Sequence, residues 1–319
     1  MAARNRIITV FGGSGFLGRH LVRRLAKLEN VVVRVPCRHP RRAAFLKTAG
    51  DVGQVVPVAV DIFSDQQVAA AVAGADVVIN LIGILYQSGR WTFEAVQGEA
   101  AGRIARAARA AGAGRLIHVS AIGADKNSVS AYARSKAIGE LEAFLAFPEA
   151  TILRPSIVFG PEDGFFNRFA AMARVSPFLP LIGGGHTRFQ PVYVGDVAEA
   201  VMAALRDPVT CGRTYELGGP LVYSFRQLMV RLLQDIHRPR KLLTIPWWLA
   251  RIQAWFLERL PNPMLTRDQV ELLRSDNVVG EESRGFAELG IVPVSLDVVL
   301  PTYLRRFRPG GGYNPHQHG

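Results

Sequence analysis

Residues 10–20 read Val10-Phe11-Gly12-Gly13-Ser14-Gly15-Phe16-Leu17-Gly18-Arg19-His20. This glycine-rich stretch decides the fold, because the apolar run 7–11 leads into it and a helical pattern over 16–28 leads out of it. Gly12 suits a tight turn with positive φ. Gly15 lets a pyrophosphate approach the backbone, and Gly18 lets the helix lie close to the sheet. N–H groups of the first helical turn would then bind phosphate, whereas a turn without a ligand is the alternative.

The chain up to residue 155 alternates apolar strands with helices. This pattern indicates an α/β Rossmann fold, in which helices cover both faces of a doubly wound parallel sheet. Right-handed crossovers give the strand order 3-2-1-4-5-6. The expected strands are 6–11, 31–37, 55–60, 77–82, 115–120 and 151–154. The expected helices are 15–28, 41–48, 65–72, 92–111 and 131–147.

The alternation loosens after Pro155. The expected elements are a helix over 165–174, a short strand over 191–194, a helix that Asp196 N-caps and that ends at Leu205, and a late strand over 214–218. From Tyr223 onward the pattern is mainly helical. We expect an NADP-binding Rossmann domain over 1–160 that parts of 190–218 complete, a small, mainly helical C-terminal domain of substrate-binding type over 161–309, and a disordered tail over 310–319.

The composition indicates a folded protein with a localised positive charge. Hydrophobic residues make up 49% of the 319 residues, which excludes global disorder. The formal net charge is +12, and residues 1–50 hold eleven Lys or Arg residues but one acidic residue. Such a field fits a phosphorylated cofactor, acidic lipid head groups or an acidic partner, and a solvated basic face is the alternative. Nucleic-acid binding is not expected, because no recognition-helix, RRM or zinc pattern accompanies the charge.

The cysteines and the start of the chain bear on the compartment in which the protein works. Cys37 and Cys211 form neither a disulfide framework nor a CxxC zinc spacing, so a reducing compartment is the default. We expect no metal site, because the i, i+2 pair of His316 and His318 belongs to the expected disordered tail and would bind weakly. No apolar run reaches the roughly 18 residues that span a bilayer. About six residues precede Ile7, which leaves no room for a signal or transit peptide. A bacterial cytoplasmic protein, or a processed organellar one, is therefore expected.

The end of the second strand bears on cofactor choice. An NAD site usually has an acid there to bind the ribose 2′-OH, but this chain has Arg38, and Arg19 follows Gly18 nearby. Because guanidinium groups suit a 2′-phosphate, we predict NADPH rather than NADH, with solvated surface arginines as the alternative. Two further groups lie at the same sheet edge: Asp61 and Ile62, placed to meet the adenine, and Leu81, Ile82 and Gly83, which leave room for the diphosphate and ribose.

Tyr132 and Lys136 lie four residues apart at the start of the helix 131–147, so they share one helix face. A lysine beside a phenol lowers the phenol pKa from about 10 and makes it usable in hydride transfer. Ser120 ends the fifth strand and completes the set. The segment 154–161, after the sixth strand, adds an element beside the nicotinamide.

These motifs resemble the short-chain dehydrogenase/reductase superfamily in its extended or atypical branch. The resemblance implies that Tyr132 is the proton donor, that Lys136 holds the nicotinamide ribose and tunes the tyrosine, and that Ser120 orients a substrate carbonyl. Ser120 and Tyr132 are only 12 residues apart, whereas active extended members have a much longer segment there that helps to build the substrate pocket. This departure argues against turnover and leaves cofactor binding intact.

Further segments narrow the resemblance: 147–150, 160–163, 190–198, 265–273 and 288–291. Together they look like the family of NADPH-binding accessory subunits of respiratory complex I (NADH:quinone oxidoreductase), in a bacterial form. The resemblance implies a tightly held NADPH with a structural or regulatory role, in a peripheral-arm subunit near the quinone site and the membrane. We expect cofactor contacts on Gly12, Ser14, Gly15, Phe16, Leu17, Arg19, Arg38, Asp61, Ile62, Leu81, Ile82, Gly83, Ser120, Tyr132, Lys136, Pro155 and Ile157.

Residues 246–260 predict an interface helix. Large residues recur along it at three- and four-residue steps: Trp248, Ile252, Trp255, Phe256 and Arg259. Tryptophan with flanking arginine is typical of interfaces with protein or lipid head groups, and packing on its own domain is the alternative. The expected partners are other complex I subunits near the quinone site, together with membrane lipid head groups. The expected location is the cytoplasmic side of a bacterial inner membrane, or the matrix side for an organellar form.

Two other functions stay open. The chain could be an active NADP-dependent reductase or epimerase that acts on a quinone, a terpenoid or a nucleotide sugar. That function needs Tyr132 and Lys136 to touch a substrate in an open pocket. The third hypothesis is a redox sensor that reads the NADPH level through its partners.

Overall fold

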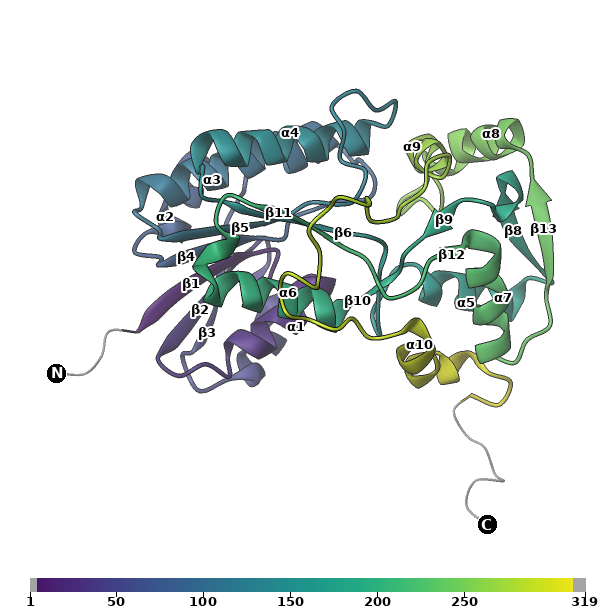
Figure 1. Ribbon diagram of the computed structural model, residues 1–319, viewed down its shortest axis with the longest axis horizontal. Helices are drawn as coiled ribbons and strands as arrows, with labels where there is room; N and C mark the ends of the chain where they lie inside the picture. Colours follow the sequence, from purple (N-terminus) through teal and green to yellow (C-terminus); the bar gives the residue numbers. More distant parts are fainter. Residues whose placement is uncertain (1–4, 312–319) are drawn as a thin grey trace, which may run out of the picture. The chain divides into compact units, whose positions relative to one another are not determined.

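The computed structural model describes residues 5–311, and the chain forms two compact units (Figure 1). The first unit contains the chain up to Pro155 together with Gly195–Leu217 and Glu281–Ile291. The second contains Ser156–Val194, Gly218–Gly280 and the described residues from Val292 onward. Residues 312–319, most of the expected tail, lie outside the described residues.

A seven-stranded parallel sheet forms the centre of the first unit, in the order β3-β2-β1-β4-β5-β6-β11. The strands are β1 (Arg6–Phe11), β2 (Val31–Cys37), β3 (Val55–Ala59), β4 (Val77–Asn80), β5 (Arg115–Val119), β6 (Thr151–Pro155) and β11 (Thr214–Leu217). The expected order of the first six strands is confirmed. The late strand β11 extends the sheet beyond β6.

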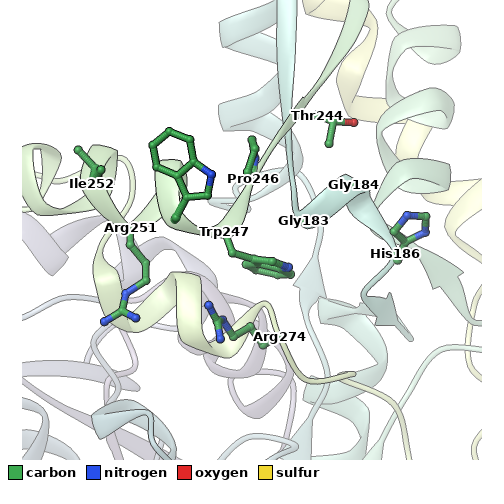
Figure 2. Close-up of a pocket in the computed structure, with 10 residues that line it drawn as sticks. Gly183, Gly184, His186, Thr244, Pro246, Trp247, Arg251, Ile252 and Arg274 are labelled. Atoms are coloured by element: carbon green, nitrogen blue, oxygen red, sulfur yellow. The ribbon is translucent and has the colours of Figure 1, made fainter.

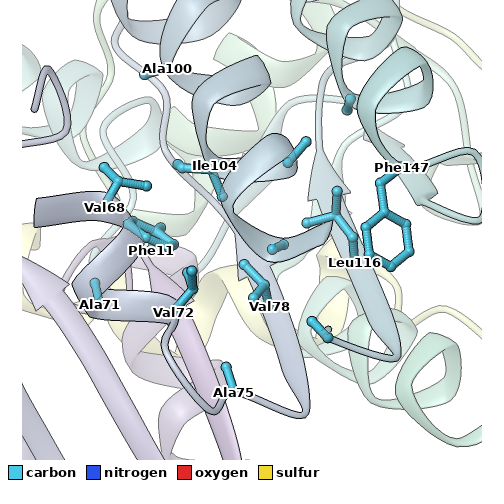
Figure 3. Packing of buried hydrophobic residues seen from close by; sticks show 14 of the residues in the cluster. Phe11, Val68, Ala71, Val72, Ala75, Val78, Ala100, Ile104, Leu116 and Phe147 are labelled. Carbon is cyan, nitrogen blue, oxygen red and sulfur yellow. The ribbon is translucent and has the colours of Figure 1, made fainter. Parts of the chain in front are cut away.

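Helices cover both faces of this sheet, with α2, α3 and α4 on one face and α1 and α6 on the other (Figure 1). They are α1 (Phe16–Leu25), η1 (Pro40–Ala49), α2 (Asp65–Val72), η2 (Glu94–Glu99), α3 (Ala100–Ala110), α4 (Ala131–Ala146), α6 (Val194–Arg206) and η4 (Pro208–Thr210). Phe11, Val78 and Leu116 of the sheet pack against Ile104 of α3 and Phe147 after α4 (Figure 3). The apolar strands are therefore buried, as a parallel sheet requires.

Four sequence predictions about the helices were wrong in detail. The helix expected over 92–111 is a π-helical segment, η2, followed by α3. The first helix ends at Leu25, three residues early, and 41–48 lies in the 3-10 helix η1. Because α6 begins at Val194, Asp196 lies in the first helical turn rather than at the N-cap, where it still interacts favourably with the helix dipole.

The second unit has short strand pairs and helices around its own core. Its strands are β7 (Val158–Phe159), β8 (Phe178–Ile182), β9 (Arg188–Phe189), β10 (Val192–Tyr193), β12 (Tyr223–Ser224) and β13 (Lys241–Ile245). Its helices are α5 (Phe166–Val175), η3 (Gly183–Gly185), α7 (Phe225–Asp235), α8 (Trp247–Leu257), α9 (Arg267–Leu272), α10 (Leu296–Leu304) and η5 (Arg305–Phe307). The pair β8–β13 is parallel, so the region after Tyr223 is less purely helical than its pattern indicates.

Candidate dinucleotide site

The glycine turn joins β1 to α1 with close backbone contacts. Gly12 has φ +77°, and a Cβ atom there would lie 3.0 Å from the carbonyl carbon of Leu81. A Cβ atom on Gly18 would lie 2.2 Å from the carbonyl oxygen of Gly12. Gly15 is the N-cap of α1, and no side chain among residues 5–311 caps this end, which leaves first-turn N–H groups available to an anion. Ser14, Phe16 and Leu17 lie in the same turn.

The two arginines expected at a 2′-phosphate lie against different aromatic rings. The guanidinium of Arg38, directly after β2, is 4.5 Å from the ring centroid of Trp91. The guanidinium of Arg19, in α1, is 5.3 Å from the ring centroid of Phe45 in η1. Each cation therefore lies over an aromatic ring, which favours a guanidinium electrostatically.

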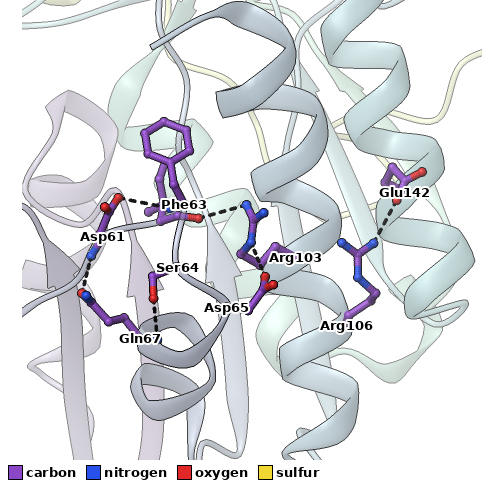
Figure 4. A network of polar contacts seen from close by, with 9 residues as sticks. Asp61, Phe63, Ser64, Asp65, Gln67, Arg103, Arg106 and Glu142 are labelled. Carbon is purple, nitrogen blue, oxygen red and sulfur yellow. Dashed lines mark hydrogen bonds and ion pairs between the residues drawn. The ribbon is translucent and has the colours of Figure 1, made fainter. Parts of the chain in front are cut away.

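Asp61 and Ile62 follow β3 and have different environments, and Figure 4 shows Asp61 beside Phe63. Asp61 Oδ1 accepts a hydrogen bond from the N–H of Phe63 at 3.2 Å, and Oδ2 lies 3.1 Å from Nη1 of Arg90. The side chain of Ile62 belongs to the hydrophobic core, and its carbonyl accepts from Nη1 of Arg103 at 3.1 Å. Asp61 is the polar group that this loop presents.

The loop after β4 lies between the glycine turn and α4 and contacts both of them. Leu81 donates its N–H to the carbonyl of Phe11 at 3.0 Å, and the N–H of Ile82 donates to Oδ1 of Asn80 at 3.1 Å. A Cβ atom on Gly83 would lie 3.3 Å from Nζ of Lys136. The absence of a side chain on Gly83 therefore keeps space beside the lysine.

Lys136 is the buried cation of the site. Its Nζ donates to the carbonyl of Val119 at 3.4 Å and lies 6.0 Å from the ring centroid of Tyr132. Tyr132 packs edge-on against Phe93, with the centroids 5.7 Å apart. Burial lowers the pKa of Lys136 to about 8, and the nearby Glu140 carboxylate opposes this shift. The structure thus brings Tyr132 and Lys136 together on one face of α4, as their spacing predicts.

Three buried polar atoms near Lys136 have no hydrogen-bond partner among residues 5–311: Gln97 Oε1, His118 Nε2 and Ser120 Oγ. Gln97 comes from the π-helical segment η2, and its Nε2 donates to Oγ of Ser135 at 3.0 Å. Burial, and then the charge of Lys136, lower the pKa of His118 to about 3, so the imidazole is neutral at pH 7. Buried polar groups normally have partners, so these atoms fit a bound polar ligand such as the ribose and amide of a dinucleotide.

Two further predicted contacts lie after β6. Pro155 ends this strand, and its carbonyl accepts a hydrogen bond from the N–H of Ile122 at 3.0 Å. Ile157 belongs to the second unit, where its N–H donates to Oδ1 of Asn277 at 3.0 Å.

An ion-pair network fixes the helix that bears Tyr132 and Lys136. Arg154 of β6 forms two hydrogen bonds to Glu140 of α4, at 2.9 and 2.6 Å, and a longer contact of 3.4 Å to Glu216 of β11. The hydrogen bond to Glu140 is the main cause that raises the pKa of Arg154. The network therefore ties α4 to two strands one turn away from Lys136.

Sequence reasoning missed Gln97, His118, Arg90 and Trp91. The π-helical segment that points Gln97 at the site has no sequence signature. His118 reads as an apolar-strand residue until its neighbour Asn80 is known, whose Nδ2 lies 3.1 Å from its Nδ1. The signal for the other two was the sequence Ser88-Gly89-Arg90-Trp91, a glycine-containing tight turn.

A second candidate surface lies on α8 in the second unit. Its outer face exposes large apolar side chains, whereas Ala250 and Ala254 are fully buried on its inner face. The exposed side chains, with their exposed fractions, are Trp248 (64%), Ile252 (49%), Trp255 (41%) and Phe256 (61%). The guanidinium of Arg259 lies 3.5 Å from the ring centroid of Trp255. This face does not pack on the second unit's own core.

A groove of about 920 Å³ runs beside this helix (Figure 2). Trp247 packs so closely on Gly183 that a Cβ atom on Gly183 would lie 2.0 Å from the indole ring. Arg274 lies 5.2 Å from the Trp247 ring centroid, and Glu271 pairs with Arg274 at 3.3 Å and with Arg251 at 3.6 Å. Aromatic and cationic groups therefore line one continuous hollow.

Residues 8–218 match the NAD dependent epimerase/dehydratase family. The chain is 39% identical to "NADH dehydrogenase [ubiquinone] 1 alpha subcomplex subunit 9, mitochondrial" of Arabidopsis thaliana. The alignment extends over 320 residues and covers 96% of this chain and 79% of the relative. The chain belongs to the NAD dependent epimerase/dehydratase family, in the branch that contains these mitochondrial NADH dehydrogenase subunits. It is also 34% identical to the "NADH-ubiquinone oxidoreductase 40 kDa subunit, mitochondrial" of Neurospora crassa, over 96% of this chain and 80% of the relative.

Other proteins that are similar to the chain bear enzyme names. A ceramide reductase of Caulobacter vibrioides is 36% identical over 208 residues, which cover 64% of this chain and 62% of the relative. The fold is also that of a dTDP-glucose 4,6-dehydratase from Streptomyces venezuelae, at TM-score 0.70 and 21% identity, over 94% of this chain and 96% of that one. Within residues 5–311, every helix is too short or too polar to cross a lipid bilayer.

Proposed function

We propose that the chain is an accessory subunit of NADH:quinone oxidoreductase (complex I) that binds NADPH tightly and holds it without turnover. The observation that carries the proposal is similarity to subunits of that enzyme along 96% of the chain. The short segment between Ser120 and Tyr132 supports the absence of turnover, because little chain is available there to build a substrate pocket.

In the proposed site, the N-terminus of α1 binds the diphosphate and Arg38, with Arg19, binds the 2′-phosphate. Asp61 borders the adenine. Lys136 donates to the ribose hydroxyls, and the unpartnered atoms around it satisfy the remaining polar groups. When bound, the dinucleotide would supply a hydride donor. The contacts proposed beyond these are Ile62, Leu81, Ile82, Gly83, Ser120, Tyr132, Pro155 and Ile157.

We further propose that the subunit stabilises the junction of the peripheral and membrane arms, near the quinone site. The exposed face of α8 supports this, because tryptophans flanked by arginines suit both partner subunits and lipid head groups. The protein would be peripheral, on the cytoplasmic side of a bacterial inner membrane or on the matrix side of an organellar one. The Rossmann domain over 1–160 would hold the cofactor, and the smaller domain over 161–309 would present α8.

Isolation of the untagged protein from its native membrane tests the assembly role. We expect complex I subunits to co-purify with it after mild solubilisation and to stay with it through size exclusion. Recovery of the chain as a free monomer that exchanges its nucleotide would contradict the proposal.

A second candidate is an active NADP-dependent reductase. The presence of Ser120, Tyr132 and Lys136, and the similarity to a ceramide reductase over 208 residues, favour it. In this case the purified chain would oxidise NADPH in the presence of a long-chain ketone or a quinone, and Tyr132→Phe would abolish the oxidation. We expect the wild-type chain to show no such oxidation. A redox sensor would instead exchange NADPH freely without oxidising it.

A further inference from the structure

A tight turn after β4 places two side chains at the adenine end of the site. The N–H of Ser88 donates to the carbonyl of Trp91 at 3.1 Å, and the N–H of Trp91 donates back at 3.0 Å. Gly89, with φ +55°, supplies the positive φ that such a two-residue turn requires. Arg90 and Trp91 therefore leave the turn as neighbours in fixed positions.

Each of these side chains contacts the end of a different strand. Arg90 pairs with Asp61, two residues after β3, with 3.1 Å between Nη1 and Oδ2. Trp91 supports the guanidinium of Arg38, which directly follows β2. Phe63 contacts both side chains of the turn: its ring centroid lies 4.8 Å from that of Trp91 and 4.8 Å from the Arg90 guanidinium.

The charge of Asp61 matters because β2 and β3 are neighbours, with Cys37 paired to Ala59. Arg38 directly follows Cys37, and Asp61 lies two residues after Ala59. Arg38 and Asp61 therefore lie at the same corner of the sheet. A phosphate monoester carries about −1.5 to −2 charges at pH 7. An uncompensated carboxylate at this corner would repel such a group, and Arg90 cancels that charge.

Trp91 acts on the orientation of Arg38. A guanidinium stacked on an indole ring loses side-chain freedom while its N–H groups remain free to donate in its own plane. No carboxylate pairs with Arg38 within residues 5–311. Arg38 is therefore held in place as a cation without a competing intramolecular ion pair.

We propose that Arg90 and Trp91 are positioning residues that set the preference of this site for a 2′-phosphorylated dinucleotide. Arg90 cancels the charge of Asp61, and Trp91 orients Arg38 toward the phosphate. This inference rests on the proposed binding of NADPH and assigns its selectivity to a turn outside the glycine loop and the β2 terminus.

The test measures dissociation constants of NADPH and NADH for the full, nucleotide-free chain by titration calorimetry. The readout is the ratio of the two constants, which a general loss of folding would not change selectively. Arg90→Gln should reduce the preference for NADPH by roughly five- to tenfold, from Coulomb's law at a solvent-exposed site. The double variant Arg90→Gln/Asp61→Asn should regain the preference for NADPH, because the uncompensated carboxylate is then removed. Trp91→Leu should reduce the preference by a similar factor, and Trp91→Phe should keep most of it.

Arg109→Gln is the matched control. Arg109 also pairs with a carboxylate, Glu149 at 3.3 Å, and also lies over an aromatic ring, that of Phe147, but on α3. This variant should leave the ratio unchanged.

An unchanged ratio in Arg90→Gln, or a failure of Asp61→Asn to restore it, would overturn the inference while the proposed NADPH function stands. A wild-type chain that does not prefer NADPH would overturn the NADPH function, and the inference with it. Weakening of the Arg90→Gln effect at high ionic strength would support the electrostatic origin.

Discussion

At the residue scale, the site is defined by groups that are unfavourable to bury without a ligand. Lys136 is 4% exposed, and His118 is 2% exposed beside it. Burial disfavours the charged form of each, which lowers both pKa values. Burying these two groups therefore lowers the stability of the nucleotide-free protein, a cost that is common at functional sites.

Replacing Lys136 should reveal this effect. The unfolded chain releases the lysine proton near pH 10.5 and the folded chain near pH 8, so the free energy of unfolding rises with pH between these values. Lys136→Met should raise the free energy of unfolding at pH 7 by about 1–3 kcal/mol and remove much of that rise. It should also weaken nucleotide binding. Urea unfolding of nucleotide-free protein at pH 7 and 9.5, with exposed Lys126→Met as control, measures this. Destabilisation at pH 7 would speak against a strained lysine.

His118 should make the protein sensitive to acid. The unfolded chain takes up the imidazole proton near pH 6.5, but the folded chain resists it down to about pH 3, so stability falls as the pH drops through this window. Between pH 7 and 5 the contribution is about 2 kcal/mol. His118→Gln should lose less stability over this range than wild type, whereas exposed His39→Gln should not differ from it. Equal acid sensitivity in all three proteins would show that His118 does not titrate in this way.

At the scale of elements, close backbone approach builds the site. The glycine turn touches the loop after β4, and that loop touches Lys136 of α4 through the space beside Gly83. Arg154 in turn ties α4 to β6 and β11. Each proposed binding group thus depends on a contact between elements that are distant in sequence.

Gly18→Ala tests the closest of these contacts. The new Cβ atom would lie 2.2 Å from the carbonyl oxygen of Gly12, and backbone cannot move away as a side chain can. We expect a loss of about 1–3 kcal/mol in stability and a loss of dinucleotide binding, because α1 must shift from the turn. Gly114→Ala is the control, since its Cβ atom would lie 3.8 Å from the nearest atom, the Asp76 carbonyl oxygen. Wild-type affinity in Gly18→Ala would refute the close-packing role.

The elements could be predicted from sequence where the signal is local. Apolar runs such as 6–11 and 31–37 gave the sheet, and the spacing of Tyr132 and Lys136 gave one helix face. The π-helical turn that directs Gln97 and the pairing of Trp91 with Arg38 depend on contacts between distant segments. Propensity and periodicity do not encode such contacts, so these residues could not be found before the fold was known.

At the scale of the whole molecule, charge and exposed apolar area are separated along the sequence. Eleven cationic residues lie within positions 1–50, and the exposed aromatic face belongs to α8. A contiguous exposed apolar face on a folded protein marks an interaction site. Both features fit a subunit that works inside an assembly.

Replacing Trp248, Trp255 and Phe256 together by serine should weaken the binding of this chain to its complex I partners. These side chains are exposed, so the triple variant should fold and bind nucleotide normally. We expect it to dissociate from the membrane fraction and from complex I, as measured by co-sedimentation and native gel electrophoresis. The matched control places serine at three exposed apolar positions of the first unit: Val52, Val129 and Leu145. Retention of the α8 variant in the complex would remove α8 from the interface.

The most direct test of the account is to identify the nucleotide that the chain carries within its native complex. Complex I that contains the untagged chain would be isolated and denatured, and the released dinucleotides quantified by mass spectrometry against the amount of this chain. We expect NADPH in a stoichiometric amount, unchanged after incubation with excess NADH. Release of NADH alone, release of no dinucleotide, or isolation of complex I without this chain would contradict it.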